Sequence, residues 1–202
     1  MSANTLPIPS TPLVGREQDV AAAANTLQRA DVRLLTLTGP PGIGKTRLAL
    51  ATAAALQSEF VDGVHFVNLA PVSDANLVLP TIAHVIGYRP VPARPPIEEL
   101  QDHLAGKRVL LVLDNFEQVI DAAPAVAELL RAAQGVKILV TSRELLRIAA
   151  EHNFPVPPLS LPPVLADHGT LRTLAALPPE RLGGYAAVQL FVARAVALHP
   201  DF

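Results

Sequence analysis

Four short, nearly continuous apolar runs place the strongest restriction on the fold of this chain. They are LLTL at 34–37, VHFVNL at 64–69, VLLVL at 109–113 and VKILV at 136–140. Runs of this kind predict strands that are buried on both faces, as a parallel sheet requires. Segments with helical spacing or composition lie before and between them, at 16–29, 46–58, 74–86 and 122–133. This alternation predicts right-handed crossovers and a three-layer α/β/α sandwich around a mostly parallel sheet of about five strands.

Proline clusters predict where these elements are interrupted, because proline lacks an amide NH and disfavours helix in the residue before it. They predict loops near 7–12, 90–96, 155–163 and 178–179. A last helix is expected over 185–198, where Val188, Phe191, Val192 and Ala195 share one face. The expected organisation is therefore a flexible lead over 1–12, a main domain over 13–158, a Pro-rich linker over 159–183 and one helix over 184–202.

Composition excludes several classes of protein. Half of the 202 residues are apolar, cysteine is absent and the formal net charge is -2. The chain can bury one sizeable core, and it has no disulfide or thiolate metal site. Its charge offers no general attraction to DNA or to an anionic membrane, so we expect no direct nucleic-acid binding. Without a signal peptide or a long apolar stretch, we expect a cytoplasmic protein.

The residues GPPGIGKT at 39–46 satisfy the pattern G-x-x-x-x-G-K-[ST] and lie between a predicted strand and a predicted helix. Glycines allow the backbone to curl with its NH groups inward, and the helix adds the positive end of its dipole, so the loop can hold phosphate oxygens. The Lys45 ammonium would contact β- and γ-phosphates, and the Thr46 hydroxyl would bind Mg²⁺. The alternative is a Gly/Pro turn that leads into a helix, but the pattern arises by chance in only about one chain in a hundred of this size. The expected nucleotide contacts are Gly39, Pro40, Pro41, Gly42, Ile43, Gly44, Lys45, Thr46 and Arg47.

Asp114 follows five apolar residues, which is the Walker B form. A carboxylate at the end of a buried strand can hold Mg²⁺, because the divalent charge offsets its desolvation. The alternative is an Asp that opens a turn. Asn115 stands where many related ATPases carry a second acid, and an amide cannot take a proton, so we expect hydrolysis to be slow or to use another group. Glu117 is the nearest acid; the alternative is a solvated residue before the next helix.

Polar groups follow three of the predicted strands, at Thr38, Asp114 and Thr141. In open parallel sheets ligands bind at the carboxyl ends of the strands, and we expect these groups to converge there. Arg143 could reach a γ-phosphate from this edge. Alternatively, Thr141 and Glu144 have capping-box spacing and Arg143 pairs with a neighbouring acid.

Two further sets of residues carry weaker signals. Val14, Gly15 and Arg16 precede the first helix, where a turn could present backbone groups to a base. The six histidines show no metal-ligand spacing, and we expect surface or loop positions for all of them: His65, His84, His103, His152, His168 and His199.

Four ordered motifs together resemble the STAND or NB-ARC class of signalling ATPases, as found in LuxR-type and SARP-type bacterial transcriptional regulators. They are LVGRE at 13–17, GPPGIGKT at 39–46, LLVLDN at 110–115 and TSRE at 141–144, and the likeness extends over about 12–202. The resemblance implies a P-loop NTPase fold, ATP or ADP with Mg²⁺ as cofactors, and adenine rather than guanine. It places Val14, Gly15 and Arg16 against adenine and ribose, and it makes Arg143 a γ-phosphate sensor.

Members of that class switch between a closed ADP form and an open, oligomerising ATP form, through a helical lid and further domains. Here the 184–202 segment resembles the first lid helix alone, so we expect a fragment or truncated relative whose exposed helix favours contact with other domains or copies. Our leading hypothesis is a regulatory ATP-binding module with slow hydrolysis. One alternative is a small-molecule or nucleoside kinase, although the Arg-rich lid that kinases usually carry is not found in this sequence. The other alternative is a non-hydrolysing interaction fragment.

Overall fold

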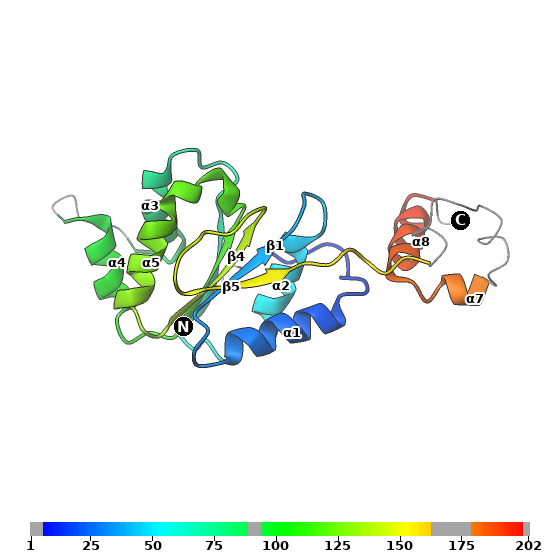
Figure 1. The fold of residues 1–202 in the computed structure, drawn as a ribbon, viewed down its shortest axis with the longest axis horizontal. Helices are drawn as coiled ribbons and strands as arrows, with labels where there is room; N and C mark the ends of the chain where they lie inside the picture. Colours follow the sequence, from blue (N-terminus) through cyan, green and yellow to red (C-terminus); the bar gives the residue numbers. More distant parts are fainter. Residues whose placement is uncertain (1–5, 89–93, 163–178, 200–202) are drawn as a thin grey trace. The chain divides into compact units, whose positions relative to one another are not determined.

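The computed structural model describes residues 6–88, 94–162 and 179–199 of the chain (Figure 1). Its helices and strands follow one another as α1 (Glu17–Gln28), β1 (Leu34–Thr38), α2 (Lys45–Ala55), β2 (Gly63–Asn68), η1 (Ala75–Leu77), α3 (Val78–Val85), α4 (Pro96–Leu104), β3 (Val109–Asp114), η2 (Phe116–Gln118), η3 (Ile120–Ala122), α5 (Ala123–Ala132), β4 (Val136–Ser142), β5 (Glu151–Pro155), α7 (Pro179–Leu182) and α8 (Ala186–Leu198).

The five strands form one sheet in the order β2-β3-β4-β1-β5, and every neighbouring pair is parallel. The four predicted strands correspond to β1, β2, β3 and β4, so the α/β class and the mostly parallel sheet of about five strands are confirmed. In this order β4 separates β1 from β3. The end of β4 therefore lies between the strand that leads into the 39–46 loop and the strand that ends in Asp114.

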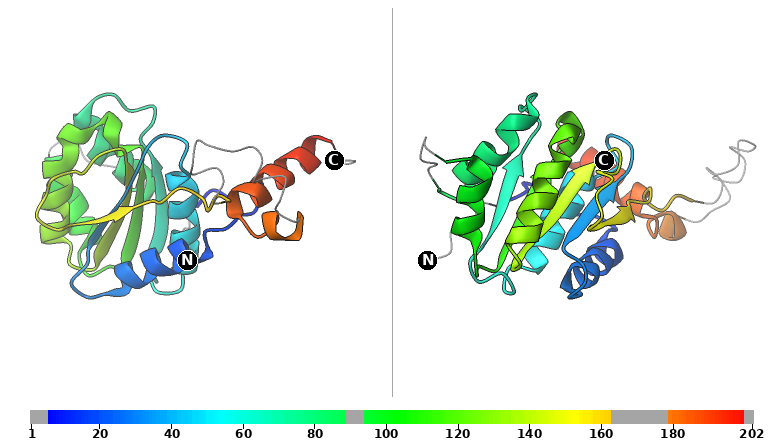
Figure 2. Two further views of the ribbon diagram at one scale, coloured as in Figure 1. Left: turned by 45° about the vertical axis from the view of Figure 1, so that its right-hand side comes forward. Right: turned by 60° about the vertical axis from the view of Figure 1, so that its left-hand side comes forward.

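Alternate residues along the strands pack into two separate hydrophobic cores, one on each face of the sheet. On β3, Leu111 packs with α3, α4 and α5, whereas Leu110 and Val112 pack with α1 and α2. The period of two along each strand produces this division, since successive side chains point to opposite faces of the sheet. Figure 2 shows the sheet between the two helical layers, which confirms the predicted three-layer sandwich.

Helix α4 and strand β5 depart from the sequence-based expectation. Helix α4 begins at Pro96, where we expected only a loop near 90–96; proline is favourable in the first turn of a helix because that NH needs no partner there. Residues 89–93 of that expected loop lie outside the described residues. Strand β5 has the sequence EHNFP and, among the described strands, pairs only with β1, so it lacks the apolar run that marks a strand buried on both faces.

The chain divides into two compact units. The first is built on Asp19–Val156 and contains the sheet; the second comprises Thr11–Gln18 and the described part of Pro157–Phe202. In the second unit, the expected last helix is α8, and the Ala186 NH donates to Ser160 Oγ (3.0 Å). Residues 163–178 of the expected linker and 1–5 of the expected lead lie outside the described residues, and α7 occupies part of the remaining linker. None of the described helices is both long and apolar enough to cross a membrane.

Candidate nucleotide-binding site

The 39–46 loop joins the end of β1 to the start of α2, at the carboxyl edge of the sheet. Gly39, Gly42 and Gly44 have positive φ, at 152°, 78° and 100°. At Gly44, the residue before α2, a Cβ would meet no atom within 4 Å, so the backbone conformation rather than space requires glycine. The loop is therefore curled, and α2 begins directly from it.

The side chain of Lys45 folds back over this loop. Its Nζ donates to Gly39 O (2.8 Å) and to Pro40 O (3.1 Å), and the residue is only 9 % exposed. These carbonyls satisfy part of the hydrogen-bonding capacity of an ammonium that has lost most of its water. The ammonium thus lies against the carbonyls of the loop, and Lys45 also lines the adjoining cavity.

Asp114 lies beside Thr46, although 68 residues separate them in sequence. Asp114 Oδ1 accepts from Thr46 Oγ1 (2.8 Å) and from Thr141 Oγ1 (2.6 Å), and the residue is 5 % exposed. The carboxyl ends of β3 and β4 bring Asp114 and Thr141 together, as the sequence predicts, whereas Thr38 Oγ1 donates to Asn153 Oδ1 of β5 (2.7 Å). A buried carboxylate with two hydroxyl donors is a suitable position for a divalent cation that shares Thr46.

Thr141 has a role that the sequence analysis missed. Its Oγ1 donates to Asp114 and also accepts from the Asn115 NH (3.0 Å), while Asn115 has a left-handed backbone with φ 66°. The alternative of a capping box by Thr141 and Glu144 is wrong, because residues 143–150 directly after β4 form no helix; instead Ser142 Oγ accepts from the Glu144 NH (3.2 Å). Leu113 pairs with Val140, so Asp114 and Thr141 follow at the same level of neighbouring strands, a pairing that the sequence alone does not give.

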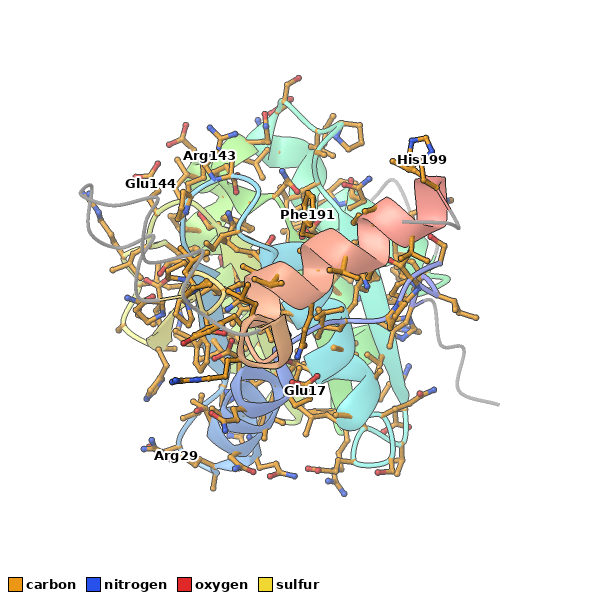
Figure 3. All side chains as sticks on the ribbon, turned by 90° about the vertical axis from the view of Figure 1, so that its right-hand side faces the viewer. Glu17, Arg29, Arg143, Glu144, Phe191 and His199 are labelled. Carbon is orange, nitrogen blue, oxygen red and sulfur yellow. The ribbon has the colours of Figure 1, made fainter. Side chains whose placement is uncertain are left out.

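Arg143 and Glu117 form an ion pair, with 3.1 Å between Arg143 Nε and Glu117 Oε1. Figure 3 shows Arg143 beside Glu144 at the opposite end of the first unit from Arg29, which precedes β1. Both members of the pair line a cavity of about 250 Å³ next to the loop, together with Pro41, Gly42, Gly44, Lys45, Thr46, Arg47, Asn115 and Thr141. The alternative that Arg143 pairs with a neighbouring acid thus describes the contact in this structure, and its predicted contact with a γ-phosphate stays a prediction.

Other residues of the sequence-based set lie elsewhere. Ile43 packs against the core formed with α1 and α2. Val14, Gly15 and Arg16 belong to the second unit, in which Arg16 Nη1 donates to Pro157 O (2.7 Å), so their contact with a base stays a prediction.

His65 contradicts the expectation that every histidine has a surface or loop position. It lies in strand β2 and is 4 % exposed. Burial lowers the pKa of His65, and the charge of Lys107 lowers it further. His168 lies outside the described residues.

A parallel five-stranded sheet with a curled Gly-rich loop between β1 and α2 defines a P-loop NTPase of α/β fold. Residues 28–149, more than half of the chain, match the family described as AAA domain. The chain therefore belongs to the AAA domain family.

Two relatives come from Mycobacterium tuberculosis (strain ATCC 25618 / H37Rv). The "Putative HTH-type transcriptional regulator" is 43% identical over 133 residues, which are 65% of this chain and 15% of that protein. An "Uncharacterized protein" is 40% identical over 152 residues, which are 75% of this chain and 38% of that protein. The chain thus spans less than half the length of these curated relatives.

A similar solved structure is the Aeropyrum pernix ORC2 protein in its ADPNP-ADP complexes. It aligns with a TM-score of 0.54 at 21% sequence identity, over 75% of this chain and 50% of that chain. At this level of identity the similarity demonstrates the shared fold alone.

Proposed function

We propose that this chain is the regulatory nucleotide-binding module of a signalling or transcriptional regulator. In this proposal it binds ATP or ADP with Mg²⁺, hydrolyses ATP slowly and changes its contacts with other domains or copies according to the nucleotide. The observation that carries the proposal is the link from Thr46 to Asp114, at 2.8 Å, beside the cavity that Lys45 also lines. The name of the 43% identical relative supports the regulatory context.

Each residue has a distinct role in this proposal. The amides of the loop hold phosphate oxygens, and Lys45 exchanges Gly39 O and Pro40 O for the β- and γ-phosphates. Thr46 and Asp114 hold Mg²⁺. Among the described residues there is no group of three or more His, Asp or Glu side chains that could hold a metal ion. Mg²⁺ that keeps waters and phosphate oxygens as ligands needs only one or two protein groups, which fits this pair.

Slow hydrolysis follows from what stands next to Asp114. Asn115, directly after Asp114, cannot accept a proton at neutral pH, so the site lacks a general base at the position that follows the metal-binding acid. Bound nucleotide would therefore persist, as a switch requires.

The remaining parts of the proposal rest on the resemblance to STAND or NB-ARC proteins. They are the preference for adenine, the contact of Val14, Gly15 and Arg16 with the base, and α8 as the first helix of a lid. The exposed apolar side chains of α8 would favour self-association or contact with another domain; they are Phe191, Val192, Val196 and Leu198.

Calorimetry with Mg-ATP, Mg-ADP and Mg-GTP tests binding, base preference and γ-phosphate discrimination in one series. We expect the adenine nucleotides to bind and Lys45→Ala to abolish their binding. Lys107→Ala is the matched control, because Lys107 Nζ contacts His103 Nε2 (3.1 Å) outside the cavity lining. Unchanged affinity in Lys45→Ala would contradict the site. A salt-sensitive shift of DNA by this chain would contradict our expectation that it does not bind nucleic acid directly.

A further inference from the structure

The ion pair of Glu117 and Arg143 joins two elements at the edge of the cavity. Glu117 lies on η2, which follows β3, and Arg143 follows β4. The recorded contact uses Arg143 Nε and Glu117 Oε1. Each residue therefore restrains the other within a site that also contains Lys45 and Thr46.

The two members of the pair have unequal access to water. The Glu117 side chain is 11 % exposed and that of Arg143 is 57 % exposed. Glu117 Oε2 is buried and has no hydrogen-bond partner in the part of the chain that the structure describes. The carboxylate thus depends on Arg143 for compensation, whereas the more exposed guanidinium retains donors that can turn to another anion.

We propose that Glu117 competes with the γ-phosphate of ATP for Arg143 and so sets the preference of the site for ATP over ADP. The inference rests on the proposed function, because it needs a nucleoside triphosphate in the cavity. Arginine binds carboxylate and phosphate with the same planar set of NH donors, so one guanidinium can serve either anion in turn. ADP has no γ-phosphate and leaves the ion pair in place.

Competition and a purely supporting role of Glu117 predict opposite changes in ATP binding relative to ADP when the charge of Glu117 is removed. If Glu117 is a competitor, removing its charge frees Arg143 and strengthens ATP binding relative to ADP. If Glu117 only holds Arg143 in position, the same change loosens Arg143 and weakens ATP binding relative to ADP.

The test measures the ratio of the dissociation constants for Mg-ADP and Mg-ATP in the full chain. Glu117→Gln keeps the size of the side chain and removes its charge, and we expect the ratio to rise about fivefold, the range of a partly exposed ion pair. Glu117→Asp serves as a second variant, since its shorter carboxylate cannot keep the 3.1 Å contact; we expect it to raise the ratio as well. A ratio that is unchanged or lower in both variants overturns the competition.

Arg143→Ala separates competition from simple repulsion between Glu117 and the γ-phosphate. In the Arg143→Ala background, we expect Glu117→Gln to leave the ratio unchanged, because no guanidinium remains to be shared. The same rise with and without Arg143 would overturn the proposal. A wild-type chain that binds neither nucleotide would refute the proposed function itself, whereas wild-type binding with an unaltered ratio in the variants refutes only the competition.

Discussion

Thr141 and Thr36 allow one substitution to be compared at two buried positions of neighbouring strands. Thr141 is 1 % exposed and its hydroxyl joins Asp114 to the Asn115 NH. Thr36 is 0 % exposed, pairs with Val140 in the β1–β4 register, and its hydroxyl has no hydrogen-bond partner among the described residues. Valine has nearly the same shape as threonine, so Thr→Val at either site removes a hydroxyl without opening a cavity.

The expected free-energy changes have opposite signs. Thr141→Val removes a hydrogen bond to a carboxylate, about 1.5 to 3 kcal/mol, and deprives the Asn115 NH of its acceptor. We therefore expect the free energy of unfolding to fall by about 2 to 3 kcal/mol. Thr36→Val removes a buried hydroxyl that costs stability while it lacks a partner, so we expect a gain between zero and about 1 kcal/mol.

Urea denaturation of the two variants and the wild type, without nucleotide, measures this difference. The slope against urea concentration should stay constant, because neither change alters the surface exposed on unfolding. If Thr141→Val costs no more than Thr36→Val, the hydrogen bonds of Thr141 do not stabilise the carboxyl edge of the sheet, and the role assigned to that residue is wrong.

Two further perturbations test the loop and the buried histidine. Gly44→Ala and Gly106→Ala both place a Cβ in open space at positive φ, 100° and 72°, so each should lower the free energy of unfolding by about 1 kcal/mol. Only Gly44→Ala should also weaken Mg-ATP binding, by about tenfold or more, because only this glycine belongs to the loop. Equal affinities of the two variants for Mg-ATP in calorimetry would refute a special role for the loop conformation. Because the pKa of His65 is lowered in the folded chain, the unfolded state takes up the proton first, and stability present above about pH 6.5 should fall as the pH drops below it. His65→Gln should reduce the difference in the free energy of unfolding between pH 7.5 and pH 5.5, measured by denaturation, whereas His84→Gln, at an exposed position, should not. The same difference in wild type and His65→Gln would contradict the contribution of His65 to the pH dependence.

The central part of the fold could be predicted because burial on both faces leaves a clear pattern. The runs at 109–113 and 136–140 consist mostly of large apolar residues, and both are strands within a residue or two of the expected bounds. Strand β5 could not be found in this way, since it lies at the edge of the sheet that the structure describes and carries polar residues such as His152 and Asn153. Helix α4 was hidden by the proline cluster, which indicates a loop equally well.

The residues of the candidate site could be predicted where a single continuous segment of the chain contains the complete motif. The 39–46 loop carries its glycines, Lys45 and Thr46 in sequence order, and Asp114 follows its own apolar run. Thr141 and the pairing of Glu117 with Arg143 depend on which strands are neighbours, and the sequence does not state the order β3-β4-β1. His65 was misjudged for a different reason: it lies within the 64–69 run that predicts a buried strand, but its polar side chain was given more weight than the run around it.

The place of β4 between β1 and β3 also determines how an outside signal could act on this site. The end of β4 contacts Asp114 through Thr141 and Glu117 through Arg143, while its backbone pairs with the strand that leads into the loop. Under the proposed function, a small displacement of that strand end would alter the Mg²⁺ contact of Asp114 and the phosphate contact of Arg143 together. An effector or adjoining domain that displaced this one strand end would then act on both contacts at once.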